Sequence, residues 1–100
     1  MALKRLISLS DVPEHGIKPV EIDGRRLLVG RTGKDVFVCD DRCPHAGVPL
    51  SEGIRHKDEI KCRQHGWEFD LVTGESIPPS AFRLQKYPAS LAEGWVLVDL

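Results

Sequence analysis

Two stretches decide the fold, CPHAGVPLSEG at 43–53 and CRQHGWEFDLVTGES at 62–76. The first opens with a Cys-x-His pair and the second with a Cys-x-x-His pair, and each pair is closely followed by a glycine. One such pair could arise by chance, but two mixed pairs in a short chain indicate a metal centre. The four candidate ligands are Cys43, His45, Cys62 and His65.

Two kinds of metal centre accept this set of ligands. One Zn²⁺ can be held by two cysteines and two histidines, but common zinc spacings pair Cys with Cys and His with His. Here each stretch supplies one thiolate and one imidazole. A binuclear iron–sulfur centre uses that mixture directly, because each loop can give its cysteine to one iron and its histidine to the other. The spacing favours the binuclear centre, with zinc as the alternative.

At these residues the chain resembles the Rieske [2Fe-2S] ferredoxin family, in which two histidines replace two cysteines on one iron. The resemblance runs through both stretches and more weakly through Ile77-Pro78-Pro79, so that the whole chain, 1–100, matches one Rieske domain. It implies a [2Fe-2S] cluster with Cys43 and Cys62 on the buried iron and His45 and His65 on the outer iron. It also implies a cluster-binding subdomain at about 41–80 and a proline-bearing loop over the cluster.

Composition excludes several classes of protein. A length of 100 residues allows one domain, and a net charge of −1 gives no strong field for nucleic acid or an anionic membrane. No apolar run approaches the roughly 18 residues that a membrane span needs. The N-terminal sequence lacks the features of a secretory signal, which favours the cytoplasm. Three cysteines, an odd number, argue against a disulfide framework.

The segments between the many Gly and Pro residues are typical of short strands. Asp23-Gly24, between the β-like runs 17–22 and 25–30, predicts a two-residue hairpin. A turn or a single helical turn is expected at 10–13. No stretch has a sustained helical period, so we expect an all-β fold, an antiparallel sandwich or barrel of about eight to ten strands. The other expected strands are 3–9, 36–39, 59–62, 67–71, 82–87 and 95–99.

Several further residues carry expectations of their own. Cys39 shares a strand face with Phe37 and is predicted to be a small buried hydrophobe rather than a ligand. Trp95 is expected in the core, and Trp67 either packs under the cluster or shields it. His15 and His56 lie in polar stretches and are expected at the surface.

Departures from the pattern of the cytochrome bc Rieske proteins indicate the branch of the family. Val48 and Gln64 stand where those proteins form a disulfide, and Trp67 and Phe69 stand where they place Ser and Tyr hydroxyls near the sulfurs. Hydrogen bonds to the sulfurs favour the reduced cluster. Their absence therefore implies a reduction potential near the low end of the Rieske range, about −150 mV, as in the oxygenase-associated type.

Nothing else in the sequence looks catalytic, and no G-x-G-x-x-G fingerprint of a nucleotide cofactor is present. The resemblance therefore implies an electron carrier rather than an enzyme. It would pass single electrons from a flavoprotein reductase to a terminal oxygenase of the aromatic-ring-hydroxylating type, with no nucleic-acid or membrane partner.

Three alternatives remain. One is the small Rieske subunit of an assimilatory nitrite reductase, partnered by the large subunit, although many such subunits have lost the ligands that this chain keeps. The others are a zinc-bearing interaction module and a domain excised from a longer oxygenase, the latter disfavoured by the start and end of the chain. For docking we expect apolar contact around Val48, Pro49 and Pro79, with Glu52 and Glu68 steering a basic partner.

Overall fold

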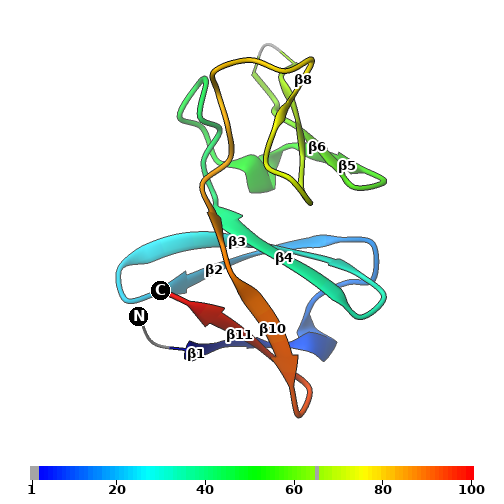
Figure 1. Ribbon diagram of the computed structural model, residues 1–100, viewed down its shortest axis with the longest axis vertical. Helices are drawn as coiled ribbons and strands as arrows, with labels where there is room; N and C mark the ends of the chain where they lie inside the picture. The colour runs from blue at the N-terminus through cyan, green and yellow to red at the C-terminus, as the bar shows by residue number, and fades with distance from the viewer. Residues whose placement is uncertain (1–2, 65) are drawn as a thin grey trace.

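The computed structural model describes residues 3–64 and 66–100 and consists of three antiparallel sheets, as the all-β prediction requires. Two sheets, β1-β11-β10 and β2-β3-β4-β9, form a base, and the third, β5-β6-β7-β8, lies at the other end of the molecule (Figure 1). No helix in the described ranges is long and apolar enough to cross a membrane. The elements are β1 (Leu3–Ser8), the 3-10 turn η1 (Leu9–Asp11), β2 (Ile17–Ile22), β3 (Arg25–Thr32), β4 (Asp35–Asp40), the 3-10 turn η2 (Leu50–Glu52), β5 (Ile54–His56), β6 (Glu59–Lys61), β7 (Glu68–Asp70), β8 (Ser76–Ile77), β9 (Lys86–Tyr87), β10 (Ala89–Ala92) and β11 (Trp95–Asp99).

The hairpin between β2 and β3 forms at the predicted dipeptide. Asp23 and Gly24 have φ of 51° and 76°, the left-handed conformation that a two-residue turn needs at both central positions. Ile22 pairs with Arg25 directly across this turn. The predicted helical turn near 10–13 is also present, as η1 one residue earlier.

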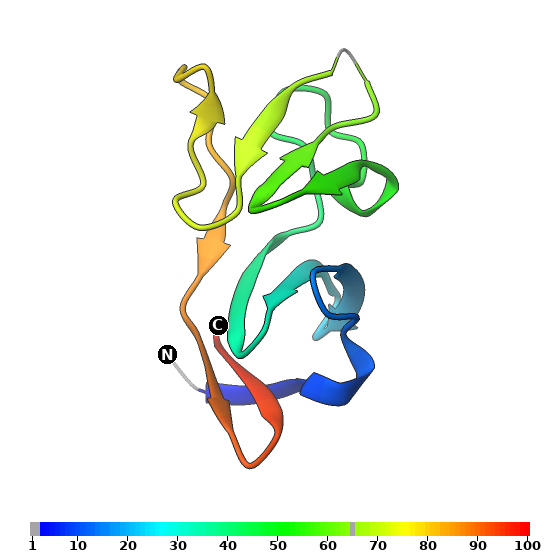
Figure 2. The ribbon, with the colours of Figure 1, turned by 90° about the vertical axis from the view of Figure 1, so that its right-hand side faces the viewer.

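Strand β3 is buried on both faces, which lets it serve two hydrophobic cores. Because side chains alternate along a strand, Leu27 and Val29 pack into the core of the base, while Leu28 packs toward the third sheet. Figure 2 shows the two layers of the base and the third sheet beyond them. The base core contains Val12, Leu27, Val29, Val38, Val96 and Val98, and the other core contains Leu28, Cys39, Cys43, Leu50, Ile60, Cys62, Phe69, Leu71 and Leu84.

Arg55 of β5 fastens the third sheet to the base. Its side chain is only 5% exposed, and Nη1 donates to the carbonyl oxygens of Gly16 at 2.7 Å and Arg31 at 2.5 Å. Its Nη2 donates to Thr32 Oγ1 and lies 3.4 Å from a carboxylate oxygen of Asp58. A guanidinium that is buried without hydrogen-bond partners is destabilising. These bonds therefore fix the position of the third sheet against the open end of the β2–β3 hairpin, opposite its turn.

Three expectations about the strands differ from the structure. The segment 82–87 is a strand only at β9, because Leu84 donates to Gly74 while the carbonyl of Gln85 accepts from Asp40, so the segment crosses from the third sheet to the base. The short strands β5, β8 and β10 were not predicted. Trp95 is half-buried rather than in the core, with the Arg5 guanidinium 5.2 Å from its ring centroid.

Candidate metal centre

The two predicted ligand stretches form loops of the same size and closure. We call 43–48 the first ligand loop and 62–67 the second. Cys43 donates its backbone N–H to the carbonyl of Val48 at 2.8 Å, and Cys62 donates to that of Trp67 at 2.7 Å. The fifth residue of each loop is a glycine with positive φ, 75° at Gly47 and 68° at Gly66. Both loops therefore use a turn that L side chains rarely adopt.

The two cysteines of these loops meet inside the protein. Cys43 and Cys62 are buried within the same apolar cluster as Phe69. Burial raises the pKa of the Cys62 thiol, and the Cys43 side chain is near enough to raise it further, while the backbone N–H of Gln64 lowers it by hydrogen bonding to the sulfur. Since thiolates are the metal-binding form, two facing thiols in an apolar setting, one with an amide donor, are a donor set that suits a buried iron.

His45 occupies the surface side of the same region. Its ring stacks on Trp67, with centroids 4.4 Å apart and planes 22° apart, and meets the edge of Phe82 at 5.4 Å. His45 is exposed, whereas Cys43, two residues earlier, is fully buried. His65, the fourth predicted ligand, lies outside the described residues. In the ranges 3–64 and 66–100, no three His, Cys, Asp or Glu side chains form a group that could hold one ion.

Trp67 stacks on the exposed imidazole and also packs against the core that contains both cysteines. Its ring also meets Phe82 edge-on at 5.3 Å and lies 6.4 Å from the ring of Phe69. Phe69 itself is fully buried beside both cysteines and offers no hydroxyl. Val48 packs against the same cluster. The apolar surroundings of the sulfurs thus agree with the expected lack of side-chain donors.

Cys39 takes the predicted role of a buried hydrophobe. It lies on β4 within the core that also contains Leu28, and it forms no disulfide. Burial raises the pKa of its thiol to about 12. His15 and His56 are exposed, as expected.

Asp41 anchors both ends of the first ligand loop, a role the sequence did not indicate. Its buried carboxylate accepts the backbone N–H and the hydroxyl of Ser51, each at 2.7 Å, and the Arg26 Nε at 2.7 Å. The bond to Asp41 raises the pKa of Arg26 above its ordinary value. Asp41 precedes Cys43 by two residues and Ser51 follows Val48 by three, so one carboxylate joins the two ends of the loop to β3.

The proline-bearing loop lies beside Trp67. Ser76 Oγ donates to the carbonyl of Pro78 at 3.0 Å and lies 2.6 Å from Ser80 Oγ, which accepts the N–H of Phe82. These bonds hold the loop in a compact turn. A hollow of about 320 Å³ separates it from the second ligand loop, lined by Gly66, Trp67, Ile77, Pro78, Pro79 and Ser80.

Among the residues expected at the docking face, Pro79 is exposed and lies on the 77–82 segment. Val48 and Pro49 are half-buried, whereas Ile77 and Phe82 are 38% and 39% exposed. Glu52, expected to steer a basic partner, is paired with Arg63 at 2.5 Å. The exposed apolar surface therefore lies on the 77–82 segment, because the first ligand loop turns its apolar side chains inward onto the core.

Comparisons with known proteins agree with this geometry. The Rieske [2Fe-2S] domain family model matches residues 3–88. The ferredoxin component of the naphthalene 1,2-dioxygenase system of Pseudomonas putida is 27% identical over 95 residues, covering 94% of this chain and 91% of the relative.

Solved structures are similar over nearly the whole chain. The Sphingomonas yanoikuyae B1 ferredoxin has a TM-score of 0.88 and 29% identity, covering 99% of each chain. A chain from the complex of reduced oxygenase and oxidized ferredoxin in carbazole 1,9a-dioxygenase has a TM-score of 0.84 and 30% identity, covering 96% of this chain and 91% of that one. A putative nitrite reductase small subunit, at 18% identity and a TM-score of 0.85 with full coverage of both chains, shares the fold alone. This chain belongs to the Rieske [2Fe-2S] domain family, and its cofactor is a [2Fe-2S] cluster.

Proposed function

We propose that this chain is a Rieske ferredoxin that carries single electrons from a flavoprotein reductase to a terminal oxygenase of the aromatic-ring-hydroxylating type. The observation that carries the proposal is the length of the match. The naphthalene dioxygenase ferredoxin component is covered over 91% of its own length, so the similarity is to a free-standing carrier. The proposal includes a cytoplasmic location and no catalytic step of the chain's own.

The proposed ligands are Cys43 and Cys62 for the inner iron and His45 and His65 for the outer iron. Supporting this, the two thiols are buried and face each other, while His45 is exposed. The bound cluster supplies a one-electron redox couple. The cluster-binding subdomain of about 41–80 and the single Rieske domain of 1–100 are part of the same proposal.

The protein's own residues then define where the electron leaves. His45, Trp67 and Phe82 form a contiguous aromatic surface, and the hollow between Trp67 and Pro79 adjoins it. Apolar contact there excludes water and brings a partner close to the histidine side of the centre. The rigid turn at 77–80 keeps this surface in shape.

Reconstitution tests the proposal. The protein is made with ample iron and sulfide, and its reduction is followed by visible and EPR spectra in the presence of a flavoprotein reductase and a terminal oxygenase of the aromatic-ring-hydroxylating type. We expect the reductase to reduce the cluster with NAD(P)H as the electron donor. We also expect the oxygenase to turn over only when the ferredoxin is present. A parallel arm uses a sirohaem nitrite reductase large subunit, which supports the alternative if this chain restores nitrite reduction and fails with every oxygenase.

A further inference from the structure

Arg42 places a positive charge directly against the first ligand loop. It precedes Cys43, and its Nη2 and Nε lie 3.7 Å and 3.8 Å from where a Cβ on Gly47 would stand. Within the described part of the chain, no hydrogen bond or ion pair involves its guanidinium, and the side chain is exposed. Its donors are therefore available to a ligand beside the loop.

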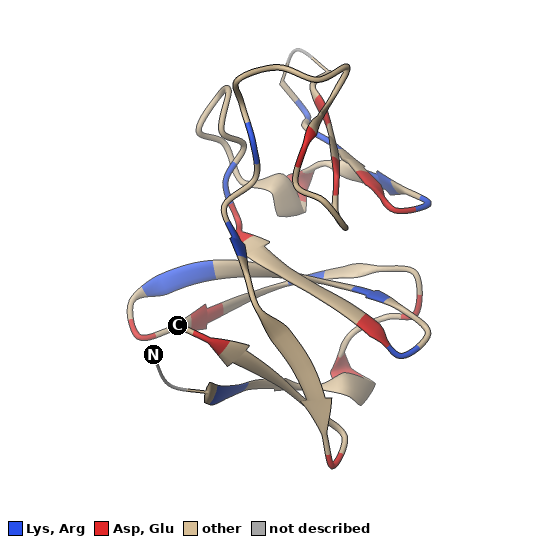
Figure 3. Cartoon of the chain, viewed as in Figure 1, with Lys and Arg blue, Asp and Glu red and all other residues tan. Residues whose placement is uncertain are grey.

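Two more guanidinium groups share a hollow with Arg42. This open depression of about 380 Å³ is lined by Arg25, Arg26 and Arg42 together with Asp40, Asp41, Gly47 and Tyr87. Figure 3 shows basic positions at the start of β3 and on the two connections between the base and the third sheet. We call this depression the arginine hollow.

The acidic residues of the arginine hollow already have partners inside the protein. Asp41 accepts bonds from Arg26 and Ser51, and Asp40 accepts the hydroxyl of Tyr87 at 2.7 Å. Arg25 lies over the ring of Tyr87, with the guanidinium carbon 5.9 Å from the centroid. A guanidinium stacked on a ring keeps in-plane N–H donors for a planar anion. Arg25 and Arg42 thus present donors that the local carboxylates do not use.

The second ligand loop also has a cation directly against it. Lys61 precedes Cys62 as Arg42 precedes Cys43, and its Cε lies 3.4 Å from where a Cβ on Gly66 would stand. Lys61 shares a depression with Glu59 and Glu68, and Arg63 is paired with Glu52 at 2.5 Å. The cations beside the second loop are thus accompanied by carboxylates, whereas the first loop borders a cluster of arginines. Such a difference in charge between the two sides of an apolar contact surface orients a partner more than it adds affinity.

We propose that the arginine hollow docks an acidic surface of the redox partner, with a carboxylate of that partner entering between Arg25 and Arg42. Bidentate pairing of guanidinium with carboxylate gives this contact its geometry. It orients the partner over the first ligand loop while the apolar surface at 77–82 makes the close contact. The inference rests on the proposed role as an electron carrier, and it reverses the expectation that acidic residues of this chain steer a basic partner.

Two small oxidants of opposite charge test the local field without a partner protein. Dithionite-reduced protein is mixed with tris(oxalato)cobaltate(III), a trianion, or with hexaamminecobalt(III), a trication, each of which accepts one electron per cobalt and leaves the cluster oxidised. Stopped-flow rates are measured at about 10 mM and about 500 mM salt, where charges are weakly and strongly screened. We expect R42Q, and more strongly R25Q/R42Q, to slow the trianion about 3- to 10-fold at low salt.

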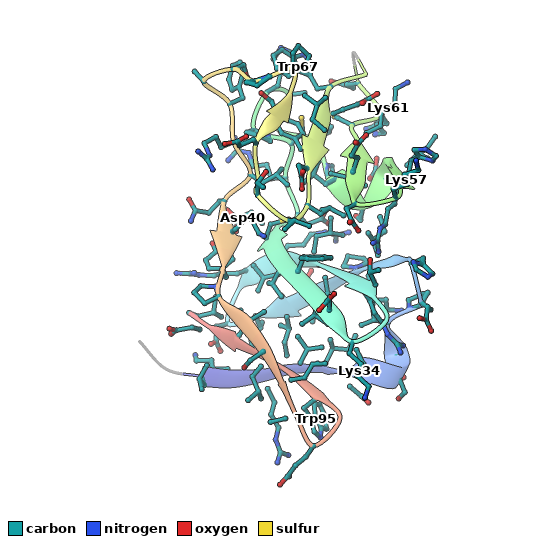
Figure 4. The ribbon with its side chains drawn as sticks, turned by 45° about the vertical axis from the view of Figure 1, so that its right-hand side comes forward. Lys34, Asp40, Lys57, Lys61, Trp67 and Trp95 are labelled. Carbon is teal, nitrogen blue, oxygen red and sulfur yellow. The ribbon has the colours of Figure 1, made fainter. Side chains whose placement is uncertain are left out.

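The matched control removes the same charge elsewhere. Lys34 lies in the turn between β3 and β4, far from Trp67 (Figure 4). K34Q should change the trianion rate less than about 1.5-fold, and at high salt all variants should converge. Equal effects of R42Q and K34Q, with unchanged spectra and midpoint potential, would overturn the inference while leaving the carrier function standing. Loss of the cluster in the unaltered protein would instead overturn the function.

A peptide probe identifies the occupant. Hexaglutamate should slow trianion oxidation of the unaltered protein, leave the trication rate unslowed, and have less effect on R25Q/R42Q. Inhibition by inorganic phosphate but not by hexaglutamate would assign the hollow to a small anion and overturn its assignment to a partner surface.

Discussion

The two ligand loops have the same backbone and different supports. Each closes with a hydrogen bond from its cysteine to the fifth residue after it, and each has a left-handed glycine just before that residue. The first loop is held at both ends by the buried carboxylate of Asp41. The second joins β6 to β7, and its last residue, Trp67, is fixed by stacking on His45 and Phe82.

This difference teaches that one loop geometry can be maintained by two kinds of interaction. A polar clamp concentrates the stability of the first loop in one carboxylate with three bonds. Strand pairing and aromatic packing distribute that of the second loop over several contacts. The first loop should therefore be more sensitive to a single substitution outside the ligands.

The largest expected effect is the same for both loops. Replacing Cys43 or Cys62 with Ser should abolish the cluster, whereas C39S should retain it, because Cys39 is a packing residue. Iron and sulfide analysis, at two of each per chain, and the visible spectrum give the result. Stoichiometric zinc in protein made with ample iron would refute the cluster assignment.

Removing the Asp41 carboxylate, which holds both ends of the first ligand loop, should have the next largest effect. D41A removes three bonds and leaves the Ser51 N–H unsatisfied, which should lower the free energy of unfolding by about 2–3 kcal/mol and speed cluster loss. The matched control is E14A, whose carboxylate is 58% exposed and lies 3.9 Å from the Arg31 guanidinium. Such a pair contributes about 0–1 kcal/mol. Denaturant unfolding and bleaching rates that do not differ between the two variants would show that Asp41 does not hold the loop.

The left-handed glycine turn, which both ligand loops contain, predicts that the same substitution lowers the free energy of unfolding equally in the two loops. G47A and G66A should each destabilise by about 1–2 kcal/mol, because alanine is strained at positive φ. G30A is the control, since Gly30 lacks positive φ and an added Cβ would meet only ordinary contacts from 3.6 Å. A cost confined to one loop, measured by denaturant unfolding, would break the equivalence of the two turns.

A feature of the fold or of the metal centre could be predicted from the sequence when the residues that determine it are close together in the chain. The Cys and His spacing and the Asp-Gly turn act within a few residues, so the sequence predicted the family, the sheet class and the β2–β3 hairpin. Asp41 could not be found, because a carboxylate next to a strand end is usually solvated and only tertiary packing brings Ser51 and Arg26 to it.

The docking face shows the same limit. The sequence pointed to Pro79, which is exposed, and to Val48 and Pro49, which are half-buried. The burial of Val48 depends on the core to which the third sheet contributes. Phe82 was assigned to a strand, whereas the bond from its N–H to Ser80 places it in the turn beside Trp67. Phe82 contacts the rings of His45 and Trp67, which are distant in sequence, so the residues around Phe82 do not indicate this position.

The smallest effect concerns Phe69, which is buried in the same core cluster as the cysteines of both loops. F69Y should raise the midpoint potential by about 50 mV if its hydroxyl donates to a cysteine sulfur, because one hydrogen bond of order 1 kcal/mol favours the reduced cluster. The unaltered protein should have a negative midpoint, near about −150 mV. F37Y is the control: Phe37 is half-buried beneath the Lys86 ammonium, 5.5 Å from its ring centroid, and the added hydroxyl should leave the potential unchanged. Redox titration followed optically separates the outcomes, since a hydroxyl with no sulfur acceptor would instead lower the free energy of unfolding by about 1–3 kcal/mol without moving the potential. That second result would mean that the ring of Phe69 supports the two loops by packing alone.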